Sequence, residues 1–142
     1  MKSDQGTYVL VFHCQVNKQV QVGKWGLINI EPGYYLYVGS AFGPGGVRAR
    51  VARHQRLDKA KHWHIDYLRE HMDLVDVWYS DQDRKLEHDW ARVLSAMPVM
   101  EPVQGFGCSD CRCCSHLFRL FKPPLFRQFC NKAGGNILST AY

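Results

Sequence analysis

The sequence of 142 residues contains no apolar run approaching the roughly 20 residues that a membrane-spanning helix requires. It also lacks a convincing secretory signal, because in MKSDQGTYVLVF polar residues and an acid precede only a very short apolar segment. No internal repeat is present, and the length is ordinary for one domain. These absences predict a single cytoplasmic domain without a membrane partner.

Acidic residues are absent after Asp110, although five Lys and Arg residues follow that position. A second basic stretch, from Arg48 to Arg69, has seven Lys and Arg residues against two acids, and residues 70–89 reverse this balance with seven acids. The whole chain carries a formal net charge of +5. Two basic surfaces around an acidic segment suit an anionic polymer held near a localised negative site, whereas solvated helix faces are the simpler explanation of the same counts.

The cysteine spacing of a secreted disulfide framework is also missing. Four of the six cysteines crowd into one short segment, as Cys108, Cys111, Cys113 and Cys114. Such crowding favours cytoplasmic thiols or a metal site. Zinc takes four ligands and often draws two of them from a distant pair, so Cys14 or Cys130 would have to complete a zinc site here. Zinc is therefore the lesser alternative to free thiols.

Several strands are indicated in the first third of the chain. β-branched and aromatic residues predict a strand over 7–14, and weaker alternation predicts another over 18–22. A turn signal then begins a strand over 34–40, whose alternation places Tyr35 and Tyr37 on the same face. We expect this part of the chain to form an antiparallel meander.

Helices and one more strand are indicated further along. They are a helix over 47–57, a second helix over 63–72, a strand over 74–79 and a helix over 86–97. Val47, Val51 and His54 share one side of the first helix, which predicts a buried stripe there. The region after Gly105 has few periodic signals and is expected to be loop-like. Strands and helices without regular βαβ repetition predict an α+β fold, with a small antiparallel sheet flanked by helices.

Two tripeptides suggest a family. Gly6-Thr7-Tyr8 on the first predicted strand and Tyr37-Val38-Gly39 on a later one resemble the two halves of the signature of the GIY-YIG nuclease superfamily. As in that superfamily, the second tripeptide continues as Gly39-Ser40-Ala41. A helix with an arginine four residues before a histidine follows, here Arg50 and His54, and then a later helix carries a glutamate, here Glu87.

Longer segments resemble the prokaryotic Uri-type endonuclease branch of this superfamily. They are PGYYLYVGSA, GPGGVRARVARH, HWHIDYL and GFGCSDCRCCSHLF. The resemblance covers roughly Gly6 to Phe118. It implies a nuclease domain over residues 1–118 that includes the Cys-rich segment 105–118. Residues 119–142 are then a basic and aromatic tail, packed on that domain or partly flexible.

The resemblance also implies a reaction and a metal. Glu87 would hold a divalent cation, Mg²⁺ or Mn²⁺, which supplies Lewis acidity for hydrolysis of a DNA phosphodiester. Tyr8 would take a proton from the attacking water, with Tyr37 beside it. Each residue has an ordinary structural alternative. Half-buried strand tyrosines are common, and an exposed helix glutamate often pairs with a nearby arginine.

Phosphate binding and proton relay would fall to the following basic residues. Arg50 would grip the phosphate as a planar fork, and Arg48 is the competing assignment because of the extra glycine-proline loop before this helix. His62 resembles the family's relay position, and His64 is its alternate. His54 lies beside an apolar stripe, where a histidine is more often part of the core than a catalyst.

Further basic residues would contact DNA along the same stretch. They are Arg48, Arg53, Arg56, Lys59 and Lys61. The resemblance also suggests that Ser109, Asp110 and His116 matter to this branch.

Three functions therefore compete. The first is a metal-dependent DNA endonuclease, which a protein partner could direct to its target because the chain shows no separate recognition domain. The second is a nucleic-acid-binding module on the same fold that has lost cleavage. The third is a thiol- or zinc-based regulatory protein that uses the Cys108–Cys114 cluster.

Overall fold

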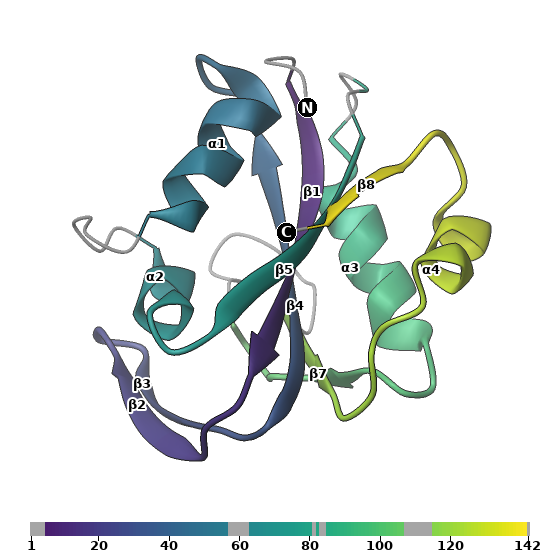
Figure 1. Ribbon diagram of the computed structural model, residues 1–142. Coiled ribbons are helices and arrows are strands. Elements are labelled where there is room, and N and C mark those ends of the chain that lie inside the picture. The colour runs from purple at the N-terminus through teal and green to yellow at the C-terminus, as the bar shows by residue number, and fades with distance from the viewer. Residues whose placement is uncertain (1–4, 57–62, 81, 83–84, 107–114, 142) are drawn as a thin grey trace.

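The computed structural model describes residues 5–56, 63–80, 82, 85–106 and 115–141 (Figure 1). Its strands are β1 (Gly6–Cys14), β2 (Lys18–Val22), β3 (Gly26–Ile30), β4 (Gly33–Ala41), β5 (Asp73–Ser80), β6 (Glu101–Pro102), β7 (Leu117–Leu120) and β8 (Leu138–Ala141). Its helices are α1 (Gly46–Gln55), α2 (His64–Arg69), α3 (Glu87–Ala96) and α4 (Phe126–Ala133). The protein is an α+β domain, as the sequence predicted.

Strand β1 is central to the main sheet. This six-stranded sheet has the order β6-β7-β4-β1-β5-β8, and every pairing in it is antiparallel. β1 pairs with β4 from Gly6 opposite Ala41 to Cys14 opposite Gly33, and with β5 on its other edge. Nearly every residue of β1 is buried, which explains its continuous run of β-branched and aromatic residues.

The expected meander is wrong. β2 and β3 form a separate two-stranded sheet, and the chain passes beyond this hairpin before β4 pairs directly with β1. Only alternate residues of β2 are buried, so this strand has a single apolar face, which it packs against α2. β4 has buried residues on both faces and can therefore lie beside β1 inside the sheet.

Helices cover both faces of the main sheet. α1 and α2 lie on one side, and α3 and α4 lie on the other (Figure 1). The alternation along β1 sends Tyr8 and Leu10 into the core beneath α1 and α2, and Val9 and Val11 into the core beneath α3 and α4. The predicted facing of β4 is confirmed in the same way, because Tyr35 belongs to the first of these cores.

The predicted helices are present, with different ends. α1 buries Val47, Val51 and His54, which confirms the predicted stripe. α2 is shorter than the predicted helix over 63–72, and α3 ends at Ala96, close to the predicted end. Among the described residues, no helix has the length and apolar character needed to cross a bilayer.

The expectation of a loop-like region after Gly105 is also wrong. β7 pairs with β4 and β6, α4 places Phe129 in the core beneath α3 and α4, and β8 pairs with β5. β7 crosses the domain boundary that the sequence suggested at residue 118. Periodicity failed here because β7 has only 4 residues, most of them buried on both faces, and α4 has only 8.

A buried ion pair locks α1 to α2. The Arg53 guanidinium donates to both carboxylate oxygens of Asp66, at 3.1 and 2.9 Å, and the Asp66 side chain is fully buried. Asp66 also accepts a hydrogen bond from the backbone N–H of Trp63 at 2.9 Å, and the Arg53 guanidinium lies 4.2 Å above the Trp63 ring. This network fixes the angle between the two helices that frame one side of the candidate site.

Replacing Asp66 with Asn should therefore destabilise the fold. Arg53 would keep its charge in a largely buried position without its counter-ion, and breaking such a pair costs about 3–5 kcal/mol. The free energy of unfolding in urea measures this loss. Asp89→Asn is the matched control, because the Asp89–Arg92 pair is exposed and contributes less than about 1 kcal/mol. Equal effects of the two substitutions would contradict the structural role of Asp66.

Candidate active site

The first feature of the site is the close packing of a tyrosine against a glycine on the neighbouring strand. Tyr8 on β1 lies directly across from Gly39 on β4. A Cβ atom at Gly39 would lie only 2.5 Å from the Tyr8 hydroxyl oxygen, so any larger residue would displace the phenol. Gly6 is needed for a similar reason, because a Cβ there would lie 1.9 Å from the carbonyl oxygen of Ser80 on β5. The glycines of both tripeptides thus allow close backbone approach around Tyr8.

The Tyr8 hydroxyl meets a buried histidine. Its oxygen lies 3.0 Å from Nε2 of His54, in the last turn of α1, and both side chains are almost fully buried. Burial raises the pKa of Tyr8 above its usual value, the nearby Tyr37 phenol raises it further, and the Arg50 charge opposes these effects. Tyr8 therefore keeps its proton at neutral pH, and His54 is positioned to receive it.

Tyr37 and Arg50 lie beside this pair. The half-buried Tyr37 ring meets the His54 ring edge-on, with 6.3 Å between centroids. Arg50 donates a hydrogen bond from Nη1 to the Ser40 carbonyl at 3.2 Å, and its guanidinium lies 4.5 Å above the Trp63 ring. Arg48 is exposed on α1, so the structure brings Arg50 and not Arg48 next to Tyr8.

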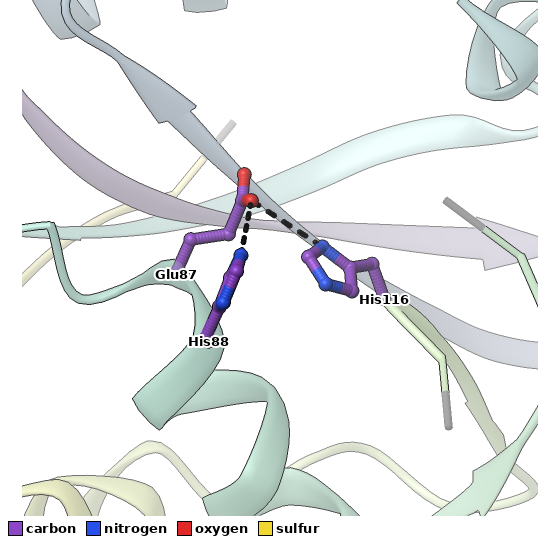
Figure 2. A group of neighbouring side chains, drawn as sticks. All are labelled: Glu87, His88 and His116. Atoms are coloured by element: carbon purple, nitrogen blue, oxygen red, sulfur yellow. Dashed lines mark ion pairs between the residues drawn. The ribbon is translucent and has the colours of Figure 1, made fainter. Parts of the chain in front are cut away.

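Glu87 supplies the carboxylate of the site. It is the first residue of α3, where the helix dipole favours negative charge, and its side chain is 25% exposed. Its charge contributes to the raised pKa of Tyr8, so the two side chains interact electrostatically. Its Oε2 atom lies 3.8 Å from Nε2 of His88 and 3.7 Å from Nδ1 of His116 (Figure 2).

Backbone hydrogen bonds hold Glu87 and His116 in place. The backbone N–H of Leu86, just before α3, donates to the Thr7 hydroxyl at 3.3 Å, which ties the start of α3 to β1. His116 accepts a hydrogen bond at its carbonyl from the Val38 N–H at 2.9 Å and donates its own N–H to the Phe106 carbonyl at 2.8 Å. Burial lowers the pKa of His116, the Glu87 carboxylate raises it, and His88 lowers it again, so the net direction is downward.

The loop before α1 adds a shallow pocket. Gly45 and Gly46 both have positive φ, at 83° and 61°, and no side chain caps the N-terminus of α1. The pocket measures about 210 Å³ and is lined by Gly43, Pro44, Gly46, Ala49, Arg50 and Arg53. The hollow therefore brings the Arg50 side chain together with the glycine-rich loop before α1.

The remaining predicted site residues have varied surroundings. Arg53 is bound by Asp66, whereas Arg56 and His64 are exposed, with the His64 ring 6.0 Å from Phe106. The other predicted positions lie outside the described residues. They are Lys59, Lys61, His62, Cys108, Ser109, Asp110, Cys111, Cys113 and Cys114.

Two residues of the site escaped the sequence reasoning. The only sequence feature that indicated a role for His88 was its position next to Glu87. A single histidine on a helix surface does not by itself predict a functional site. Asp66 lies within the predicted helix over 63–72, but its spacing from the basic helix gave no indication of the ion pair with Arg53.

The fold and site define an α+β protein in which tyrosines, an arginine, histidines and a carboxylate gather around the start of β1. Residues 7–137 match the family described as a domain of unknown function, DUF123, and the chain belongs to that family. No curated protein and no solved structure matches the chain.

The titration of His116 tests the electrostatics of the cluster. Because burial disfavours the imidazolium form, an NMR titration should give a midpoint below the value of about 6.5 expected for an exposed histidine. The unfolded chain then binds the proton more readily, so the His116 contribution to stability is full above pH 6.5 and is lost as the pH falls through the lower folded pKa.

Glu87→Gln provides the second half of that test. Removing the carboxylate removes the charge that favours protonated His116, so the midpoint should fall further in this variant. A midpoint that rises in Glu87→Gln, or one above the exposed value in the native protein, would contradict the described arrangement.

Proposed function

We propose that the protein is a metal-dependent endonuclease of the GIY-YIG superfamily, of the Uri type, which hydrolyses DNA phosphodiester bonds. One observation carries the proposal. The two signature-like tripeptides lie side by side on β1 and β4, with Tyr8 hydrogen-bonded to His54. Arg50 and Glu87, the other residues that the resemblance requires, both act electrostatically on the same phenol.

The Tyr8–His54 pair supports general-base catalysis. As water attacks the phosphorus atom, the Tyr8 oxygen accepts a proton from that water while its own proton passes to Nε2 of His54. The relay is needed because burial keeps the Tyr8 hydroxyl protonated, so free phenolate is scarce at neutral pH. His54 thus has the relay role in this mechanism, whereas His62, to which the resemblance assigns that role, lies outside the described residues.

Arg50 is suited to hold the scissile phosphate. A guanidinium carries five N–H donors in a planar fork, and one contact to the Ser40 carbonyl orients it. Stacking on Trp63 limits its motion further. The hollow between Arg50 and the loop before α1 gives a phosphate group access to these donors.

Glu87 would hold the divalent cation, Mg²⁺ or Mn²⁺. Its carboxylate is partly exposed, so an ion there could keep several waters, as hard cations prefer. When bound, the ion supplies Lewis acidity to the phosphate and stabilises the leaving oxygen. Glu87 also lies in the first turn of α3, where the helix dipole favours negative charge.

Exposed cations on α1 would bind the DNA backbone. Arg48 on α1 and Arg56 directly after it are exposed, whereas Arg53 is paired with Asp66 and so also has a structural role. The proposal includes a protein partner that supplies target recognition. It also includes a cytoplasmic location, which the free thiols of Cys14 and Cys130 support.

Hydroxyl deletion tests the catalytic role of Tyr8. Tyr8→Phe should slow cleavage of labelled DNA structures in Mg²⁺ or Mn²⁺ by about 10²–10⁴-fold, because general-base assistance is lost. DNA binding should be nearly unchanged. Tyr34→Phe is the matched control, since Tyr34 lies on β4 but packs on the opposite face of the sheet. Its cleavage rate should equal that of the native protein.

Glu87→Gln keeps the size of the side chain and removes its charge, so it should also abolish metal-supported cleavage. Combining it with Tyr8→Phe should cost little beyond the worse single change, because groups that act together are not additive. Cleavage at the native rate by folded Glu87→Gln would refute the metal assignment. Binding without cleavage of any DNA structure would instead identify an inactive nucleic-acid-binding module.

Salt dependence tests the DNA surface. If Arg48 and Arg56 each contact a phosphate, Arg48→Ala and Arg56→Ala should each reduce the slope of log affinity against log salt by about 0.9 on duplex DNA. Arg127→Ala is the control, because this exposed arginine lies on α4, on the far side of the sheet. A DNA affinity that does not change with salt concentration would contradict electrostatic DNA binding by Arg48 and Arg56.

A further inference from the structure

Glu87 is the centre of a three-residue cluster that the proposed reaction does not fully use. One ligand atom from each of Glu87, His88 and His116 lies within 4.8 Å of the others (Figure 2). Glu87 and His88 come from the start of α3, and His116 immediately precedes β7. Figure 2 shows both imidazole rings turned toward the same carboxylate oxygen.

The separations suit ligands that share one ion. Metal–ligand bonds of about 2.1 Å place neighbouring ligand atoms about 3.0–3.4 Å apart in tetrahedral or octahedral geometry. The Glu87 carboxylate oxygen lies 3.7 Å from the His116 nitrogen and 3.8 Å from the His88 nitrogen, which exceeds this range by a few tenths of an ångström. The His88 side chain is 55% exposed, so a small rotation of this ring can close the gap.

We infer that Glu87, His88 and His116 form a metal site that binds a divalent first-row transition-metal ion, such as Zn²⁺ or Co²⁺, in preference to Mg²⁺. Imidazole nitrogens suit these borderline ions, whereas Mg²⁺ prefers oxygen ligands. The inference deepens the proposed function and rests on it for what the ion does in catalysis, because both share Glu87. It adds two histidine ligands to the carboxylate that the proposed function assigns to the divalent cation.

The fold holds two of these ligands in place before any ion binds. The backbone of His116 is fixed by hydrogen bonds to Val38 and Phe106, and its side chain is 4% exposed. The start of α3, which carries Glu87, is tied to Thr7. Three protein ligands leave coordination positions for water or a phosphate oxygen, which is the arrangement of catalytic sites.

A similar pair elsewhere in the protein shows why the third ligand matters. Glu70 and His71 are also adjacent in sequence, and their Oε1 and Nε2 atoms are 3.7 Å apart. Among the residues that the structure describes, only the cluster at Glu87 contains three such groups close enough to share an ion. His71→Ala is therefore a matched control, because it removes a histidine beside a glutamate outside the cluster.

Metal binding without DNA tests the inference independently of cleavage. The purified protein is freed of metal by a chelator and titrated with Co²⁺, and visible absorption and calorimetry measure the binding. We expect one ion per chain, displaced by Zn²⁺ but not by about a hundredfold excess of Mg²⁺. His88→Ala and Glu87→Gln should each weaken Co²⁺ binding at least about tenfold, whereas His71→Ala should leave it unchanged.

His116 is buried, so its removal could unfold the protein. Metal binding by His116→Gln is therefore interpreted only if circular dichroism shows that this variant is folded. If it is not folded, His88→Ala, at an exposed position, is sufficient for the test. Cobalt binding that survives His88→Ala and shows thiolate-to-cobalt absorption would assign the ion to cysteines and overturn the inference. Competition by Mg²⁺ at equal concentration would overturn it as well.

The two proposals fail in different ways. Magnesium-supported DNA cleavage that His88→Ala leaves intact would retain the nuclease function and reject the three-ligand site. Cobalt binding that requires Glu87 and His88, in a protein that cleaves no DNA structure, would retain the site and reject the nuclease function.

Discussion

The burial of β1 on both faces is the constraint on which the other elements depend. Because β1 is covered by helices on each side, its alternation sends neighbouring residues to opposite layers. Thr7 reaches toward α3 and bonds the backbone at Leu86, while Tyr8 reaches toward α1 and bonds His54. Two consecutive residues thus attach α1 and the start of α3 to one strand, which places Tyr8, His54 and Glu87 in the same candidate site.

Close packing at glycine makes this arrangement possible. The Tyr8 phenol occupies space that a side chain at position 39 would fill, so the cross-strand partner must be glycine. Burial of the phenol also has an electrostatic consequence, since it raises the pKa of Tyr8. Packing and chemistry are therefore linked: the same contact that fills the core also sets the protonation state of the hydroxyl.

The arginines of α1 and its C-terminal end differ in their surroundings and in the roles that they can take. Arg53 turns toward α2 and is neutralised by Asp66, whereas Arg48 and Arg56 remain in solvent. Arg50 lies between these extremes, oriented by Ser40 and Trp63 yet open to the hollow before the helix. A basic helix is thus divided into a structural residue, a candidate phosphate ligand and exposed cations, with spacing along the helix deciding which role each arginine takes.

Local sequence patterns were sufficient to predict β1, β4, the buried stripe of α1 and the extent of α3. Side-chain periodicity indicates which face of an element is buried. The tripeptides around Tyr8 and Tyr37 were likewise visible in the sequence. Periodicity does not report which elements meet. The choice of His54 over its neighbours as the partner of Tyr8 depends on how α1 packs on β1, and the meeting of His116 with Glu87 depends on β7 pairing with β4. These contacts join distant parts of the chain, and so only the tertiary structure determined them.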